Sequence, residues 1–190
     1  MSQVITFPQT FPAYHPKAGQ PTYFVEKIWN GIINNSFEID YAKVCTYNNE
    51  LSSDILCPFW KSINIGFSGL GAKHHTIRSG NRWKVGDKFS PRVWSGKPYQ
   101  SKQITIAPDI EVKNVWDFEI KKTNFHGEIF ITHSFPELGI YNFKERVINP
   151  GWIEEIAEND GLSITDFMQW FRYPKPFSGQ IICWNENINY

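Results

Sequence analysis

The order of helical and strand-like patterns along the chain constrains its fold more than any other feature. The segment PTYFVEKIWNGIINN has Phe24, Ile28 and Ile32 at intervals of four residues, which predicts a helix over about 22–33 with Pro21 in its first turn. Strand-like segments rich in β-branched and aromatic residues follow, namely DKFSPRVW, KQITIAPDIEVKNVWDFEI and GEIFITHSF. Pro91 inside the first of these strands indicates an edge strand or a bulge.

The last third of the chain predicts a helix, a turn, a second helix and a buried strand. The dipeptide Asp160-Gly161 ends the first helix, WIEEIAEND, and Ser163 with Asp166 forms a capping box before DFMQWF. The strand is GQIICWN. Strands flanked by helices in this order predict an α+β fold, built as a small barrel or a strongly bent sheet.

We expect one domain over residues 1–190 because no composition shift, repeat or low-complexity tract divides the chain. Residues 1–20 are rich in Pro, Phe and Tyr and indicate an extended arm. Residues 34–70 carry few periodic apolar residues, which is typical of an insertion: either a lid over a site or a structural flap.

Composition excludes several classes of protein. The chain has 19 basic and 19 acidic residues, so it lacks the strongly basic face of a protein that coats nucleic acid. This balance is compatible with a pocket for one nucleotide or a short single strand.

The three cysteines form no C-x-x-C pair, which favours a reducing compartment and argues against a zinc site. With no signal peptide and no long apolar run, we expect a soluble, cytoplasmic protein without a membrane partner.

One short segment, GAKHHTIRSGNRWKVGD, gathers chemistry-bearing residues. Along an extended strand Thr76 and Arg78 share a face, and a turn at Gly71 would let Lys73 reach the same side. A guanidinium is suited to a phosphate or carboxylate, and a lysine whose pKa is lowered beside a second cation can act as a base. The alternative is a solvated basic loop.

Histidines near this segment raise the question of a metal. His74 and His75 are adjacent, so a strand would send them to opposite faces and at most one would serve a given site. His126 and His133 belong to a different predicted strand region. We expect no metal site and no cofactor.

Gly71, Lys73, Thr76 and Arg78 fit G-x-K-x-x-T-x-R, and on these residues the chain resembles the ASCH family, whose β-barrel is similar to the PUA fold. RWKVGDKF resembles the family's W-x-x-G-D turn, Asp160-Gly161-Leu162-Ser163 its acidic-Gly-hydrophobic element, and GQIICWN its closing strand. The resemblance covers about residues 60–186 and implies a PUA-like barrel flanked by helices.

The resemblance also implies candidate catalytic residues. One member of the family removes the acetyl group from acetylcytidine, and its lysine, threonine and glutamate correspond to Lys73, Thr76 and Asp160. Aspartate is one methylene shorter than glutamate, and displacing a catalytic group by ~1 Å can cost ~100-fold in rate. Glu158, two residues earlier, is an alternative acid.

Three functions follow as hypotheses. The first is recognition of a nucleotide, modified nucleoside or RNA, with ligand contacts from Gly71, His75, Arg78, Arg82 and Trp83. The second is an amidohydrolase for an acylated nucleobase or nucleoside, with a ribonuclease as a weaker variant of the enzyme reading. The third is a non-enzymatic barrel that binds another protein. The sequence specifies no oligomeric state.

Overall fold

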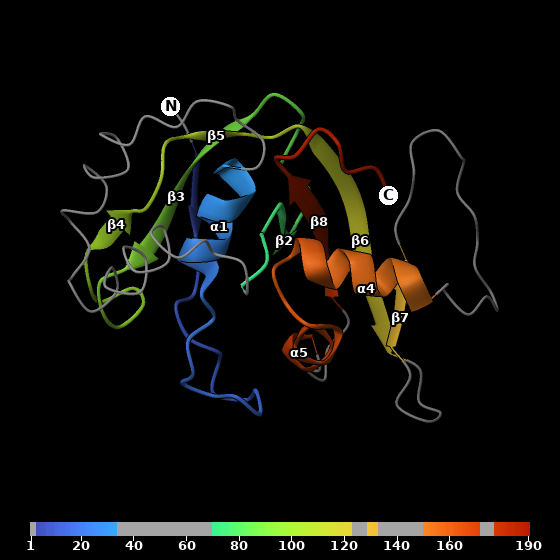
Figure 1. The fold of residues 1–190 in the computed structure, drawn as a ribbon, viewed down its shortest axis with the longest axis horizontal. Coiled ribbons are helices and arrows are strands. Elements are labelled where there is room, and N and C mark those ends of the chain that lie inside the picture. The colour runs from blue at the N-terminus through green and yellow to red at the C-terminus, as the bar shows by residue number, and fades with distance from the viewer. Residues whose placement is uncertain (1–2, 34–69, 123–128, 133–149, 172–176) are drawn as a thin grey trace. The chain divides into compact units, whose positions relative to one another are not determined.

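A computed structural model describes residues 3–33, 70–122, 129–132, 150–171 and 177–190 (Figure 1). The chain divides into two compact units. The first unit is Met1–Lys73 with Asp87–Glu111, and the second is His74–Gly86 with Val112–Tyr190. Each unit contains a β-sheet and helical structure, so the predicted α+β class is confirmed.

The first unit combines one sheet with helix α1 (Phe24–Ile33). Strand β3 (Lys88–Trp94) lies at the centre of the sheet, parallel to β1 (Gln3–Thr6) and antiparallel to β4 (Gln103–Thr105) and β5 (Ile110–Glu111). Alternate residues Phe89 and Val93 are fully buried, as expected for one covered face. The Trp29 indole donates a hydrogen bond to the Ile106 carbonyl at 3.0 Å, which ties α1 to the segment after β4.

Pro91 lies in a central strand, so the expectation of an edge strand is wrong. Its carbonyl accepts a hydrogen bond from the Ile106 amide at 3.0 Å, and its nitrogen faces the same side of the strand. On that side, β3 pairs first with β4 and then with β5, and residues 106–109 between these two strands belong to neither. Proline has no backbone N–H to donate, but at this position the neighbouring segment is not a regular strand. A central strand therefore tolerates Pro91.

The N-terminal region contributes to the sheet and the core of the first unit. Gln3–Thr6 forms β1, and Phe7 and Phe11 are buried. Residues 9–22 fold back on themselves through a bridge between Thr10 and Pro21. Pro21 therefore lies outside α1, and the helix begins at Phe24, two residues later than predicted.

In the second unit, two helices accompany a four-stranded sheet in the order β2-β8-β6-β7. Its strands are β2 (His75–Ser79), β6 (Asn114–Lys122), β7 (Ile129–Thr132) and β8 (Phe177–Cys183), all antiparallel to their neighbours. The helices are α4 (Pro150–Asn159) and α5 (Ile164–Trp170). Rings of Phe118 and Phe167 meet edge to face with centroids 6.4 Å apart, which packs α5 on the sheet.

The N-cap of the predicted capping box, Ser163, is confirmed. The Ser163 hydroxyl accepts a hydrogen bond from the Asp166 amide at 3.1 Å and donates one to the Asp166 carboxylate at 2.8 Å. The Ser163 hydroxyl therefore satisfies one backbone amide in the first turn of α5, and the Asp166 carboxylate holds that hydroxyl in place.

Neither sheet closes on itself within the residues that the structure describes, so the barrel stays a prediction. The expected insertion falls outside the described residues up to position 69, as do His126 and His133. In the described part of the chain, no helix has the length and apolar character needed to cross a membrane.

Candidate functional site

Gly71 makes the turn that the sequence predicts. Its φ is +70°, a left-handed conformation that favours glycine. The Gly71 carbonyl accepts a hydrogen bond from the Asn30 side chain at 2.7 Å, and the Lys73 amide donates to the Lys27 carbonyl at 2.8 Å. These bonds hold the first part of the motif against α1.

Lys73 is a buried lysine. Its exposed fraction is 1%, and its Nζ lies 4.3 Å from the centroid of the Phe24 ring, in a cation–π contact. Lysines are almost never this deeply buried unless the fold provides for the charge. The position excludes a solvated loop at this residue.

Glu26 adds a second buried charge-bearing group to the first unit. It lies one helical turn before Asn30 on α1, so the two share a face. Burial raises the pKa of the Glu26 carboxyl, while a hydrogen bond from its own backbone and the nearby Lys27 lower it. Glu26 and Asn30 were not predicted from the sequence, although their spacing on the helix was a usable signal.

In the second unit, β2 divides the motif residues between two faces of the sheet. Thr76 and Arg78 share one face, and His75 lies on the other. Arg78 lies opposite Gln180 on β8, and Thr76 opposite Ile182. Thr76 is buried, whereas Arg78 is partly exposed.

Gln180 holds the W-x-x-G-D turn over the face that carries Arg78. Its side-chain oxygen accepts from the Trp83 amide at 3.0 Å, and its side-chain nitrogen donates to the Trp83 carbonyl at 3.4 Å. The Trp83 ring is only 3% exposed, while the exposed Arg82 guanidinium lies 5.3 Å from its centroid. Trp83 therefore supports the turn, and Arg82 is the side chain that a ligand in solution can reach.

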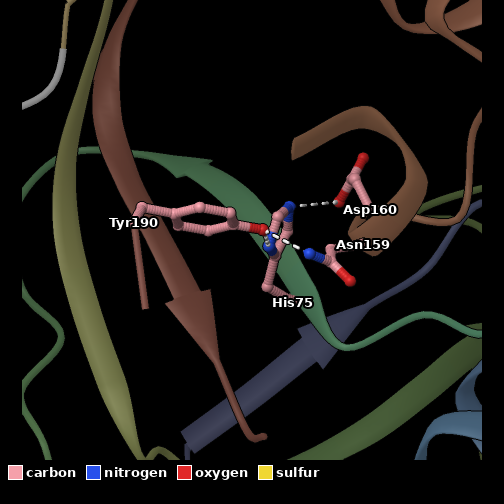
Figure 2. Close-up of polar contacts among 4 residues, drawn as sticks. All are labelled: His75, Asn159, Asp160 and Tyr190. Atoms are coloured by element: carbon pink, nitrogen blue, oxygen red, sulfur yellow. Dashed lines mark hydrogen bonds and ion pairs between the residues drawn. The ribbon is translucent and has the colours of Figure 1, made fainter. Parts of the chain in front are cut away.

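Figure 2 shows the polar cluster on the opposite face, formed by His75, Asn159, Asp160 and Tyr190. The Asn159 amide donates to the Tyr190 hydroxyl at 2.9 Å, and this hydroxyl lies 2.9 Å from His75 Nδ1. Which of these two groups donates to the other depends on the tautomer of the His75 ring. The second ring nitrogen, His75 Nε2, lies 4.0 Å from Asp160 Oδ1.

Burial governs protonation in and around this cluster. Loss of solvent raises the pKa of Tyr190, despite the hydrogen bond from Asn159, so the phenol stays neutral. The neighbouring His74 has its pKa lowered by burial, and its Nδ1 lies 3.3 Å from the Asn185 amide nitrogen. The cluster in Figure 2 thus combines a neutral phenol with one acid, Asp160.

Asp160 occupies the end of α4 in a Schellman motif. The Leu162 amide donates to the Ala157 carbonyl at 2.9 Å and the Gly161 amide to the Glu158 carbonyl at 2.8 Å, with Gly161 at φ +76°. A carboxylate at a helix C-terminus opposes the helix dipole by about 0.3–1 kcal/mol. Asp160 is nevertheless 7% exposed, whereas Glu158 is exposed, so the buried acid of this element is Asp160.

The sequence-predicted residues are thus distributed as follows. Gly71 and Lys73 belong to the first unit, and the remaining candidates belong to the second. There the structure pairs Asp160 with His75 and leaves Thr76 on the other face of β2. Fully buried His75 contacts Tyr190 and Asp160, and a direct ligand contact by His75 stays a prediction. Tyr190, Asn159 and Gln180 were missed because no local pattern marks them.

Among the described residues, no group of three or more His, Cys, Asp or Glu side chains is arranged to hold a metal ion. In comparisons with known proteins, no family model, no curated protein and no solved structure matched the chain.

Proposed function

We propose that the chain recognises a nucleotide or RNA through the segment 71–78, as its resemblance to the PUA-like barrel of the ASCH family implies. The observation that supports this proposal is burial. Lys73, Thr76 and Asp160 are 1%, 5% and 7% exposed, although all three are polar. Burying such groups is costly, so a solvated loop does not account for them.

The side chains of the segment suit a phosphorylated ligand. Arg78, which is partly exposed, offers a planar fork for a phosphate, and the same segment carries the buried positive charge of Lys73. The left-handed turn at Gly71 leaves open space where a side chain would stand, since nothing lies within 4 Å of an added Cβ. A ligand backbone or base edge can approach such a turn closely.

Hydrolysis of an acylated nucleoside such as acetylcytidine is the second candidate function. The observation that favours it is the position of Asp160. This acid is buried beside His75 at the C-terminus of α4, where the helix dipole disfavours a negative charge. The resemblance assigns Lys73 as the base, Thr76 as the hydroxyl that attacks or polarises the acyl carbonyl, and Asp160 as the orienting carboxylate. Asp160 is paired with His75 and Thr76 lies on the other face of β2, so the role of Thr76 is the part of this proposal that the geometry opposes. His75, being fully buried, acts as a positioning residue for Asp160.

Both functions are tested with Lys73→Met, which removes the charge and keeps most of the side-chain volume. Binding of cytidine monophosphate is measured by calorimetry, and loss of acetylcytidine is followed by chromatography. We expect wild type to bind, and Lys73→Met to bind at least about 10-fold more weakly because a charged hydrogen bond is worth about 1.5–3 kcal/mol. Lys84→Met, at an exposed position, is the matched control.

Two results would overturn these proposals. Wild type that neither binds the nucleotide nor turns over the acetylated nucleoside removes both functions. Equal binding and turnover by wild type and a folded Lys73→Met removes the segment as the site. Binding without turnover leaves recognition as the function.

The free, buried thiol of Cys183 supports a reducing compartment. We place the protein in the cytoplasm as part of this proposal.

A further inference from the structure

The connection between β3 and β4 is an ordered hairpin loop held by its own hydrogen bonds. The Ser95 amide donates to the Lys102 carbonyl at 2.9 Å, and the Gly96 amide donates to the Ser101 hydroxyl at 3.0 Å. The Ser101 hydroxyl in turn donates to the Lys97 carbonyl at 2.9 Å. The side chains on this loop therefore start from a fixed backbone.

Tyr99, at the tip of the loop, is unusual in two respects. Its φ is +63°, a conformation that costs a bulky residue energy and that glycine or asparagine adopts more readily. Its side chain is 89% exposed, far more than the two other exposed tyrosines in the described part of this unit, Tyr14 at 52% and Tyr23 at 38%, of which Tyr23 also has a positive φ of 57°. A strained position that presents an aromatic ring to solvent indicates a binding role rather than a stabilising one.

A second ring supports the first. The Trp94 ring lies 5.3 Å from the Tyr99 ring, centroid to centroid, at an interplanar angle of 50°. Trp94 is only partly buried, and its strand neighbour Gln103 also remains partly accessible. The two rings form a local aromatic platform at the end of β3.

The stretch of chain that carries this platform is basic. Between residues 88 and 108 the chain carries four basic residues and no acidic one, and two of the four, Lys97 and Lys102, lie exposed on the hairpin loop. Arg92 shares the face of β3 with Trp94, where its guanidinium donates to the Gln103 side chain and to the Ser90 hydroxyl at 3.3 Å each. Rings beside cations, without acids, complement bases on a phosphate backbone.

We propose that this hairpin is a contact surface for single-stranded RNA. A base stacks on Tyr99, and Lys97 and Lys102 neutralise the flanking phosphates. The inference rests on the proposed function, because it takes RNA as the ligand class, and it deepens that function by adding nucleotides beyond the one bound at the motif. Stacking on an aromatic ring is tolerant of sequence, so we expect little base preference here.

The test measures binding of a fluorescein-labelled eight-nucleotide RNA by anisotropy, beside binding of cytidine monophosphate. Wild type should bind the RNA more tightly than the mononucleotide. Tyr99→Ala should weaken RNA binding about 5- to 150-fold, the range found for one stacked base. Tyr14→Ala, which removes an exposed tyrosine of the same unit outside the hairpin, should bind RNA as wild type does.

A folding defect is excluded with Tyr99→Gly, because glycine adopts the positive φ without strain. This variant should keep the thermal stability of wild type and still lose RNA affinity. Equal RNA binding by wild type and both Tyr99 variants would overturn the inference, as would wild type that binds RNA no better than the mononucleotide.

Failure of the inference and failure of the proposed function give different results. Mononucleotide binding that depends on Lys73, without a gain for RNA, refutes only the hairpin. RNA binding that depends on Tyr99 but not on Lys73 refutes only the motif as the site. No binding of either ligand refutes both.

Discussion

The strongest indications of function in this chain come from a few polar side chains that are buried although burial is costly for them. Lys73 and Asp160 are each more than nine-tenths buried, and Asp160 also opposes the dipole of α4. The fold compensates locally, with the Phe24 ring beside the amine and His75 beside the acid. Such compensated costs are typical of functional sites, where local stability is given up for chemistry.

Buried neutral acids predict that the protein loses stability at alkaline pH. Burial raises the pKa of Cys183 from 9.0 to about 12, and it raises the pKa of Tyr190 above its ordinary value of 10.0. The unfolded chain releases the Cys183 proton above pH 9 and the Tyr190 proton above pH 10, while the folded chain keeps both. The free energy of unfolding should therefore fall between pH 9 and pH 12, by roughly 1 kcal/mol per pH unit for each group.

Urea denaturation at several pH values measures this slope. Tyr190→Phe removes one titrating group, so the slope above pH 10 should become shallower than in wild type. An identical slope in wild type and Tyr190→Phe would show that Tyr190 titrates alike in the folded and unfolded chain.

At the scale of secondary-structure elements, the ends of helices and strands place the candidate groups. The Schellman motif after α4 turns the chain so that Asp160 faces His75 on β2, and the turn at Gly71 brings Lys73 against α1. Both devices depend on a glycine with positive φ. A change at either glycine should therefore affect the site through backbone geometry.

Gly161→Ala tests the helix end directly. Alanine at φ +76° is strained by roughly 1 kcal/mol, so the free energy of unfolding should fall by about that amount. The matched control is Gly96→Ala on the exposed hairpin loop, where the nearest atom to an added Cβ is 3.5 Å away. Chemical denaturation compares the two variants, and equal stability in both would mean that the Schellman geometry is not required.

Local patterns were sufficient to predict most elements near their observed positions. The periodicity around Ile28, the capping box at Ser163 and the alternation in β3 each depend on residues close together in sequence. The edge-strand alternative for Pro91 was wrong because the tolerance of a proline there depends on a gap between β4 and β5, which is a property of the paired segment. The register of β1 against β3 likewise depends on distant residues.

The candidate site was predictable only in part, because some of its contacts join residues that are far apart in the sequence. The motif positions Gly71 and Lys73 stand out in the sequence, and the structure shows the predicted turn and a buried amine. The partner of Asp160 did not stand out, because His75 reaches it through the pairing of β2 with β8 and the packing of α4. Tyr190 enters the cluster by tertiary contact alone.

At the scale of the whole molecule, neutrality conceals an uneven distribution of charge. Among the described residues the first unit holds seven basic and four acidic side chains, and the second holds six and eight. The basic excess of the first unit includes the hairpin that carries Tyr99. Overall neutrality therefore argues against coating of long nucleic acid, and it is compatible with a short basic contact surface.

The size of that surface predicts how RNA affinity depends on salt. Neutralising Z phosphates of a single strand gives a slope of about −0.7Z for the logarithm of affinity against the logarithm of salt concentration. Contacts from Lys97 and Lys102, with a partial one from Arg92, should contribute between about −1 and −2 to this slope. Lys97→Gln should make the slope less steep by about 0.7 in anisotropy titrations, whereas Lys84→Gln, exposed in the second unit, should leave it unchanged. A slope near zero in wild type, or the same change in both variants, would mean that the hairpin lysines do not contact phosphates.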